Sequence, residues 1–358
     1  MSRIQVLIDG VAFENANQIG IWRVFFEVIS RLKSEVDFVV LLDRDAVNKV
    51  PSGVPIFRSS HRRQGYHRTP AINKLKRKIA ERKLERLFPR AIWHSTFFTP
   101  DPRSRGRSVV HVYDMIAERF YYLSPFLEEQ SSLKAAIVPR ADRVISISKA
   151  TTQELVRFYP SLGGKIATAT LGSEHFTRVG KTKTTRLSNC LFVGHRNSYK
   201  NFQLIVRALA LRRWPKEVKL HVVGAPFTQA EIAFIQYYGV ESKIKHLGKL
   251  SDAELSQQYL RSQSFIFPSL DEGFGLPVLE SQAHGCLPIL SDIPIFREVA
   301  GGAAAFFDPH DPGSLAEQIA AATLPVCTSI RLRCKENAER FSWDETAELI
   351  YNCYFDLA

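Results

Sequence analysis

The chain has 358 residues, of which 45% are hydrophobic and 23% are charged. This balance is normal for a globular protein, and the length favours two domains of ordinary size over a single core. No apolar run approaches the ~20 residues that cross a bilayer, and five scattered cysteines argue against a disulfide framework or a zinc site, so we expect a cytoplasmic protein.

Basic charge is concentrated in the first half of the chain. Residues 1–175 carry 28 Lys and Arg against 17 Asp and Glu, whereas residues 176–358 carry 20 against 19; the densest part, residues 44–90, has 14 basic and 3 acidic side chains. Such a field attracts nucleic acid, an anionic membrane surface or a phosphorylated substrate, and a basic face without a partner is the plainer alternative. Because no nucleic-acid-binding motif or stacking pattern of aromatics accompanies the charge, we expect no nucleic acid.

Short apolar runs alternate with segments of helical periodicity throughout the first half, which is typical of α/β units with parallel strands. Strands are predicted at Ile4–Asp9, Phe38–Leu42, Ala91–His94, Val109–Tyr113 and Val144–Ser148. A helix is predicted over Gly20–Leu32, and a basic amphipathic one over Asn73–Leu87. Residues 44–68 show no clear periodicity, so they form either a loop or a segment ordered by a partner.

A break in composition at Gly172–Ser188 marks a domain boundary, because small and polar residues dominate there. Strands are then predicted at Cys190–Val193, Lys219–Val223, Ile244–Leu247, Phe265–Pro268, Pro288–Ser291 and Ala304–Phe307. Helices are predicted at Phe202–Leu211, Gln229–Tyr238, Asp252–Ser262, Pro277–His284 and Ser314–Ala322, with one or two more between residues 329 and 357.

Two segments of the second half carry the residues best suited to chemistry, and each connects a strand to a helix. The first is Asp271–Glu280. Gly273 and Gly275 would let a ligand approach the backbone, and the helix start offers free N–H groups to an anion. Pro277 suits the first helical position and Gly285 the end of that helix.

The glutamates of this segment, Glu272 and Glu280, are separated by seven residues. Glu280 is expected in the first turn, where an acid complements the helix dipole, but this structural explanation does not extend to Glu272. The second segment is Val193–Phe202. Within it, Arg196 and Lys200 could converge on an anion held over the loop between strand and helix, each contact contributing on the order of 1.5–3 kcal/mol. Surface charge without a ligand is the alternative for this cationic pair.

Together the two segments resemble the retaining glycosyltransferases of family 4 (group 1), in which a Glu-x7-Glu element and a Gly…Arg…Lys-Asn element form the nucleotide-sugar site. Further similarity lies in residues 9–23, 94–100, 109–116, 144–149, 285–289, 296–299 and 341–343. The resemblance implies an α/β architecture of the GT-B type, with two Rossmann-like doubly wound domains facing a central cleft. Residues 1–175 would bind the acceptor, residues 176–340 the nucleotide sugar, and a helix over residues 341–358 would pack back on the first domain.

The resemblance also implies a role for each matching position. Arg196 and Lys200 would hold the donor diphosphate and stabilise the departing nucleotide. Glu272 would hydrogen-bond the transferred sugar, and Glu280 the ribose hydroxyls. The remaining donor contacts would come from Gly20, Gly194, Phe274, Gly275 and Leu276.

One departure from the family concerns the first domain, where the frequent His-Asp pair is replaced by Tyr113-Asp114. Asp114 is expected to be catalytic, because ligands of α/β sheets bind at strand ends. His94, His111 and Tyr113 are candidates for sugar or acceptor contacts, and for either histidine a structural role is the alternative. Retaining hydrolases use a carboxylate as nucleophile, and nothing in this sequence identifies such a residue. A front-face reaction is therefore expected. No metal site is expected either.

The implied function is transfer of a hexosyl group, with mannosyl as the first choice, to a lipid-linked or growing bacterial surface polysaccharide. The pattern Gly-x-Arg-x-x-Tyr-Lys-Asn-Phe is similar to polysaccharide and O-antigen mannosyltransferases, so GDP-mannose is the first donor expected and a UDP-sugar the second. The donor is a substrate, and no cofactor is expected. The basic first half would meet the acceptor at the inner membrane surface. A sugar-nucleotide epimerase or hydrolase of the same fold is the alternative, and a basic nucleic-acid-binding protein is an alternative from another class.

Overall fold

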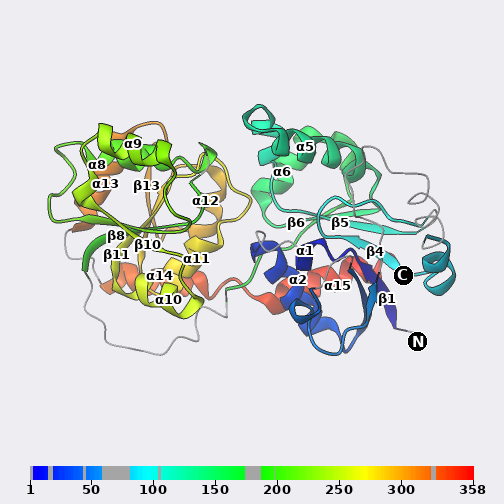
Figure 1. Ribbon diagram of the computed structural model, residues 1–358. Helices are drawn as coiled ribbons and strands as arrows, with labels where there is room; N and C mark the ends of the chain where they lie inside the picture. The colour runs from blue at the N-terminus through cyan, green and yellow to red at the C-terminus, as the bar shows by residue number, and fades with distance from the viewer. Residues whose placement is uncertain are drawn as a thin grey trace. The chain divides into compact units, whose positions relative to one another are not determined.

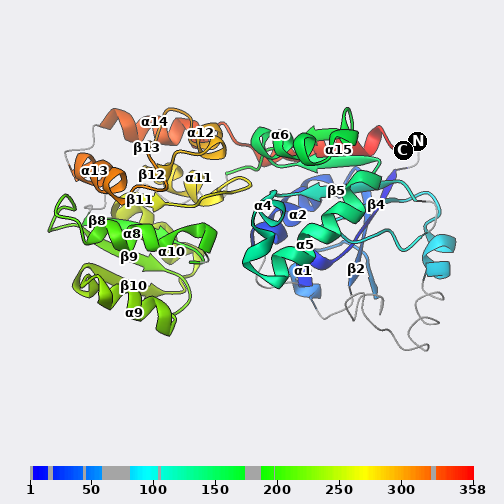
Figure 2. The ribbon, with the colours of Figure 1, turned by 90° about the horizontal axis from the view of Figure 1, so that it is seen from above.

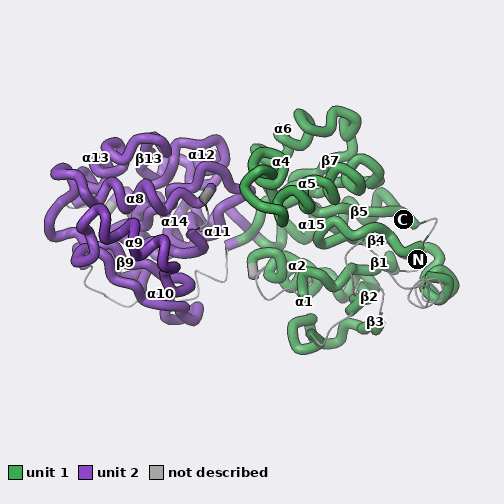
Figure 3. Tube along the Cα trace, turned by 45° about the horizontal axis from the view of Figure 1, so that its top comes forward, with its two compact units in different colours: residues 1–172, 343–358 green, residues 173–342 purple. Residues whose placement is uncertain are grey.

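The computed structural model describes residues 3–14, 19–42, 46–58, 81–103, 106–173, 187–196, 198–323 and 328–358. They belong to two compact units, which are described one at a time. Unit 1 contains residues 1–172 and 343–358, and unit 2 contains residues 173–342 (Figure 3). The boundaries expected after residues 175 and 340 therefore lie within a few residues of this division. The chain leaves unit 1, builds unit 2 and returns to unit 1.

Unit 1 is built on a parallel sheet with the strand order β3-β2-β1-β4-β5-β6-β7. Its strands are β1 (Ile4–Ile8), β2 (Val36–Leu42), β3 (Ile56–Arg58), β4 (Ile92–Ser95), β5 (Ser108–Val112), β6 (Arg143–Ser146) and β7 (Ile166–Thr168). The chain first builds outward from β1 in one direction and then returns to add β4 on the other side. The order thus reverses between β1 and β4, as in doubly wound folds.

Helices cover both faces of this sheet (Figure 1). They are α1 (Val11–Glu14), α2 (Ile19–Leu32), α4 (Ile116–Phe120), α5 (Pro125–Ile137), α6 (Lys149–Phe158) and α15 (Trp343–Phe355), with the 3₁₀ turns η1 (Val47–Lys49), η2 (Tyr121–Leu123), η3 (Val138–Arg140) and η4 (Pro160–Leu162). The terminal helix α15 packs beside α2. On the other face, Val110 and Val144 of the sheet are buried against Leu155 of α6.

Much of the basic region lies outside the described residues. This holds for residues 43–45 and 59–80, which include the first part of the helix predicted over Asn73–Leu87. Residues 81–87 are helical, and Leu84 is buried in a cluster with Leu7 and Trp93.

Unit 2 is built on a second parallel sheet, ordered β10-β9-β8-β11-β12-β13. Its strands are β8 (Leu187–Val193), β9 (Lys219–Val223), β10 (Ile244–Gly248), β11 (Ser262–Phe267), β12 (Leu287–Ser291) and β13 (Ala305–Phe307). The chain again starts at a central strand, builds one side and then the other. The strand order therefore reverses between β8 and β11.

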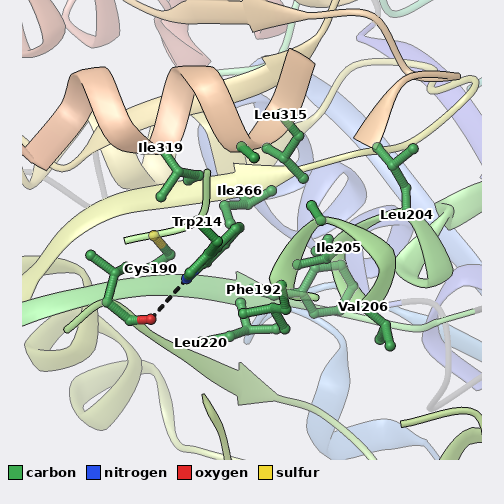
Figure 4. Close-up of a cluster of buried hydrophobic side chains, with 14 of the residues drawn as sticks. Cys190, Phe192, Leu204, Ile205, Val206, Trp214, Leu220, Ile266, Leu315 and Ile319 are labelled. Carbon is green, nitrogen blue, oxygen red and sulfur yellow. Dashed lines mark hydrogen bonds between the residues drawn. The ribbon is translucent and has the colours of Figure 1, made fainter. Parts of the chain in front are cut away.

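Helices also cover both faces of this second sheet, as two views at right angles show (Figure 2). They are α8 (Phe202–Leu209), α9 (Gln229–Tyr237), α10 (Asp252–Arg261), α11 (Leu276–Ala283), α12 (Pro294–Ala300), α13 (Pro312–Thr323) and α14 (Thr328–Ala338), with the 3₁₀ turns η5 (Ser198–Lys200) and η6 (Glu241–Lys243). Trp214 is only 1% exposed in the core that α8 and α13 form with the sheet, and its indole N–H donates to the Val218 carbonyl at 2.9 Å (Figure 4). Buried apolar side chains on this face fix the sheet whose strand ends carry the candidate site.

Candidate active site

Two loops of unit 2 meet at the carboxyl ends of the neighbouring strands β8 and β11. The strand order reverses between these strands, and ligands of open α/β sheets bind at such a switch point. The loop after β8 contains η5, and the loop after β11 leads to α11. The Leu270 N–H donates to the Tyr199 carbonyl at 2.8 Å and joins the two loops. The structure thus brings together the two segments that the sequence singles out.

Lys200 and Glu272 form a direct ion pair across these loops. Lys200 Nζ lies 2.5 Å from Glu272 Oε1, and the Ser269 hydroxyl donates to the same oxygen at 2.7 Å. The ammonium also lies over the Phe267 ring, 5.3 Å from its centroid. The two charged side chains are 17% and 10% exposed, so water screens the pair only weakly. A cation suited to phosphate and a carboxylate suited to sugar hydroxyls therefore stand side by side, and their donor contacts remain predictions.

Arg196 is engaged in a second, separate ion pair. Its Nε donates to Glu231 Oε1 at 2.6 Å, and its Nη2 donates to Glu231 Oε2 at 3.2 Å and to the Pro226 carbonyl at 2.9 Å. The guanidinium lies over the Phe227 ring, 4.6 Å from its centroid. Burial acts to raise the pKa of Glu231, but the hydrogen bonds from Arg196 and Thr228 outweigh it and the pKa is lowered. The diphosphate role predicted for Arg196 draws no support from these contacts and remains a prediction.

Glu280 does not lie in the first turn of its helix, so the dipole explanation for it is wrong. The left-handed Gly275 caps α11, with φ 93°, and the helix begins at Leu276, one residue earlier than predicted. This places Pro277 second in the helix and moves Glu280 beyond the first turn. The Glu280 carboxylate instead accepts a hydrogen bond from the Tyr259 hydroxyl at 3.0 Å. Burial, followed by this nearby carboxylate, raises the pKa of Tyr259.

The other predicted donor residues lie in or beside the loops between strands and helices. Gly194 directly follows β8, and its N–H donates to the last carbonyl of β9 at 3.1 Å. Phe274 is buried, and Leu276 opens α11. In unit 1, Gly20 is exposed in the first turn of α2, with open space where a Cβ would stand. Their contacts with a donor remain predictions.

Asp9 organises the corresponding switch point of unit 1, between β1 and β4. Its carboxylate is fully buried and accepts hydrogen bonds from Thr96 N at 3.0 Å, Ser95 Oγ at 3.3 Å and Val11 N at 3.3 Å. The Thr96 and Thr99 hydroxyls donate to it as well. The sequence pattern presents Asp9 only as the end of a strand. An acidic residue that directly follows a buried apolar strand is the signal that could have identified it.

His94, His111 and Tyr113 form a buried stack on the face of the sheet that α2 and α15 cover. The ring centroids lie 5.7 Å apart between the histidines and 5.0 Å apart between His111 and Tyr113. Phe25 of α2 packs edge-on against both imidazoles, and His94 Nδ1 lies 2.6 Å from the Tyr354 hydroxyl of α15. Both histidines are 0% exposed, which favours the structural alternative over the predicted contacts with sugar or acceptor.

The environment of the stack keeps both imidazoles neutral. Burial lowers the pKa of His111 to about 3, and burial, followed by the repulsion that a protonated His111 would exert, lowers the pKa of His94. In the unfolded chain a histidine has a pKa of ~6.5. Protons therefore bind mainly to the unfolded state. The stability that these histidines contribute is fully present above pH ~6.5, and it is lost as the pH falls toward their pKa in the folded protein.

We expect His111→Phe to make the free energy of unfolding less dependent on pH. Each buried neutral histidine contributes a slope of up to ~1.4 kcal/mol per pH unit between pH 6 and 4, and the variant lacks one of the two. Urea unfolding of the variant and the wild type at several pH values measures the difference. The matched control is His310→Phe, because His310 is exposed; equal slopes in the wild type and His111→Phe would contradict the assignment.

Asp114 is the accessible carboxylate of a charged cluster beside β5. Its Oδ1 accepts the Ile116 N–H at 3.0 Å, and Lys134 Nζ donates to the Asp114 carbonyl at 2.8 Å and lies 3.5 Å from Oδ1. Lys134 also pairs with Glu118 at 2.8 Å. The side chains of Lys134 and Glu118 are 3% and 4% exposed, whereas that of Asp114 is 35% exposed. A buried cation that the sequence did not single out thus holds Asp114, whose catalytic role remains a prediction.

In the part of the chain that the structure describes, no three His, Cys, Asp or Glu side chains gather as a metal ion would require. No described helix combines the length and the apolar character needed to cross a membrane. The four cysteines that the structure describes are buried, and none of them forms a disulfide with another described cysteine.

Comparison with known proteins identifies unit 2. Residues 177–341 match the family described as "Glycosyl transferases group 1". This segment is nearly all of unit 2, so unit 2 is a group 1 glycosyl transferase domain.

The chain is similar to two Escherichia coli mannosyltransferases. It is 26% identical to the serotype-specific mannosyltransferase WbdA over 248 residues, which cover 64% of this chain and 30% of WbdA. The chain thus matches less than a third of the length of that relative. It is 22% identical to O-antigen chain mannosyltransferase B over 290 residues, which cover 74% of each protein.

Among solved structures, HepE from Anabaena in complex with UDP and glucose aligns with a TM-score of 0.71 and 15% identity, covering 98% of this chain and 99% of that one. A likeness at this identity shows the fold. The two doubly wound parallel-sheet domains are those of the GT-B fold, as the sequence predicts. The expectation that they face a cleft remains a prediction.

Proposed function

We propose that this chain, whose second unit is a group 1 glycosyl transferase domain, transfers a hexosyl group from a nucleotide sugar to a saccharide acceptor. The observation that carries the proposal is the contact between Lys200 and Glu272, 2.5 Å apart at the switch point of unit 2. Nucleotides bind at this point in doubly wound sheets. The ammonium of Lys200, which we propose for the diphosphate, and the carboxylate of Glu272, which we propose for the sugar, both lie at this point.

The chemistry requires stabilisation of two developing charges. Cleavage of the anomeric C–O bond places negative charge on the departing diphosphate and positive charge on the sugar. Lys200 would stabilise the diphosphate, which is electrostatic preorganisation, and Glu272 would accept hydrogen bonds from the sugar. We further propose a front-face reaction with retention of configuration and without a metal ion. The acceptor oxygen attacks on the face from which the diphosphate leaves, and a phosphate oxygen takes the acceptor proton.

Mannose is the sugar that the comparisons favour. Both relatives reported above are named mannosyltransferases, and one is named for the O-antigen chain. We therefore propose GDP-mannose as donor and a lipid-linked or growing bacterial surface polysaccharide as acceptor. A UDP-sugar is the second choice, because HepE was solved with UDP and glucose.

Titration calorimetry with GDP, UDP and ADP tests the donor proposal. GDP is expected to bind most tightly, and tighter binding of UDP would replace the proposed base. Failure to bind any of the three would contradict the function itself. Rapid consumption of GDP-mannose in the absence of any acceptor would favour the epimerase or hydrolase alternative.

We also propose that unit 1 meets an anionic membrane surface, where a lipid-linked acceptor would lie. Basic side chains attract such a surface, and aromatic side chains settle at its interface. Tyr121 and Tyr122 of η2 and Phe126 of α5 are 55%, 68% and 57% exposed. Three aromatic side chains with this exposure within residues 121–126 suit shallow insertion between lipid headgroups.

The protein is expected to float with anionic vesicles and to remain below neutral ones. The double variant Tyr122→Ser, Phe126→Ser should weaken this flotation by several-fold, because the aromatic contacts are lost. Tyr237→Ser is the matched control, since Tyr237 of unit 2 is 84% exposed. Negligible binding of the wild type to both kinds of vesicle would exclude the membrane proposal.

A further inference from the structure

We infer that Arg196 and Glu231 act as a positioning pair, which fixes the loop after β9 against the loop after β8 so that the nucleotide meets an assembled site. In this role Arg196 serves the donor without touching the diphosphate. The inference rests on the proposed function and adds Glu231, a residue for which no functional role is predicted from the sequence. Four sets of contacts carry it.

The Glu231 carboxylate joins a helix cap to the neighbouring loop. Thr228 and Glu231 form the capping box of α9, in which Thr228 N donates to Glu231 Oε2 at 2.7 Å and Glu231 N donates to Thr228 Oγ1 at 3.2 Å. Arg196 donates to both oxygens of this same carboxylate. One carboxylate therefore ends the loop after β9 and anchors it to the loop after β8.

Arg196 also holds the middle of the loop after β9. Its Nη2 donates to the Pro226 carbonyl at 2.9 Å, and its guanidinium covers the Phe227 ring at 4.6 Å. A planar guanidinium can make this forked contact and stack on a ring at the same time, which a lysine cannot do. The side chain of Arg196 is 6% exposed.

Gly224 shows how closely the two loops approach. It directly follows β9, with φ +153°, and a Cβ at this position would lie 2.7 Å from the Gly194 carbonyl oxygen and 3.4 Å from Arg196 Nη1. Backbone therefore meets backbone at the ends of β8 and β9, which a side chain would prevent.

The neighbouring strand β10 supports the same loop. His246 of β10 has its Nε2 3.0 Å from the Ala225 carbonyl and 3.3 Å from the Gly224 carbonyl. Its ring packs against Phe227 with centroids 4.9 Å apart. The loop after β9 is thus held on one side by Arg196 and on the other by His246.

Direct binding of the diphosphate by Arg196 would break these contacts. Its Nε and Nη2 would have to leave Glu231, whose carboxylate would then lose its cation beside the cap of α9. Lys200 differs from Arg196, because its partner Glu272 also lies at the switch point. There the ammonium can contact a phosphate while the carboxylate contacts the sugar. We therefore assign charge stabilisation to Lys200 and positioning to Arg196.

Glu231→Gln distinguishes the two possible roles of Arg196, because they predict changes of opposite sign in nucleotide affinity. If Arg196 positions the loop, Glu231→Gln and Arg196→Gln each weaken binding of the best of GDP, UDP and ADP by roughly 10–100-fold, and the double variant is no weaker than either single one. If Arg196 binds the diphosphate directly, Glu231→Gln frees the guanidinium and leaves affinity unchanged or raises it. The second result would overturn the inference.

Steady-state rates and a conservative variant give further readouts. A positioning role predicts a higher KM for the donor with kcat changed only a few-fold, whereas loss of a cation from the departing diphosphate lowers kcat. Arg196→Lys should fail to restore affinity, since lysine cannot form the fork; restored affinity would favour direct charge stabilisation. Arg213→Gln is the matched control, because it breaks the exposed pair of Arg213 with Glu317 in the same unit.

Hydrogen exchange on the free protein tests the loop without any nucleotide. Arg196→Gln should speed exchange at the N–H groups of Thr228, Glu231 and Ile232, while the thermal midpoint stays within a few degrees; unchanged exchange would overturn the inference.

If the wild type binds nucleotide but Glu231→Gln binds it equally well, the inference alone fails. If the wild type binds none, the proposed function fails and this inference with it.

Discussion

Replacement of Lys200 by alanine is expected to lower kcat/KM for sugar transfer by roughly 10²–10³-fold. The ammonium is the cation placed at the switch point of unit 2, where the diphosphate would leave. Its removal also leaves Glu272, which is 10% exposed, as an unpaired carboxylate that repels phosphate. Both effects act in the same direction. Initial rates with GDP-mannose and calorimetry with GDP measure the loss in turnover and in affinity.

Two variants sharpen this result. Glu272→Gln keeps the ammonium and removes the competing charge, so it should retain or improve GDP affinity while transfer falls. Lys219→Ala is the control, because Lys219 is exposed at the opposite end of the same sheet, at the start of β9. A Lys200→Ala protein with undiminished GDP affinity would place the phosphate site elsewhere.

Asp9→Ala is expected to destabilise unit 1 by about 3 kcal/mol or more, since each hydrogen bond to a buried charged acceptor contributes on the order of 1.5–3 kcal/mol. The variant leaves the Thr96 N–H and the hydroxyls of Thr96 and Thr99 without this acceptor. Those groups lie in the loop after β4, so its order should suffer too. Urea unfolding monitored by circular dichroism reports the loss.

The comparison variants for Asp9 distinguish hydrogen bonding from other effects of substitution. Asp9→Asn keeps one acceptor oxygen and the side-chain volume, so its loss should be smaller. Asp37→Ala alters an acidic residue of β2 whose side chain is 52% exposed, and little change is expected there. A stability of Asp9→Ala equal to that of Asp37→Ala would show that the network contributes little.

The sequence predicted most of the regular elements because their signals are local. The strand predicted over Lys219–Val223 has the observed bounds, and α10 begins at Asp252 because Ser251 and Glu254 form a capping box. Other elements have too weak a hydrophobic pattern to be predicted from the sequence. The strands β3 and β7 have three residues each, and α5 exposes Phe126, so neither alternation nor a continuous apolar face marks them.

Within the candidate site, the sequence predicted where the residues lie better than it predicted which side chains they contact. The pattern placed Lys200 and Glu272 each in a loop between a predicted strand and a predicted helix, and the structure shows that the two strands are adjacent and brings the side chains into contact. The pattern could not reveal that Arg196 pairs with Glu231, 35 residues away, because a capping box alone explains an acid at that place. Nor could it show that His94 meets Tyr354, 260 residues away. Such pairings depend on tertiary packing, which local patterns do not encode.

The return of α15 to unit 1 reverses the order in which the two units can be completed during synthesis. Arg31 of α2 pairs with Asp344, and Tyr354 covers His94, so the part of the first sheet that α15 covers beside α2 stays uncovered until the ribosome has made all of unit 2. Unit 2 is a single uninterrupted segment, residues 173–342, and can fold as soon as it emerges. The unit translated first is therefore completed last, because the contacts of α15 with its sheet and with α2 form only after residues 343–358 have been made.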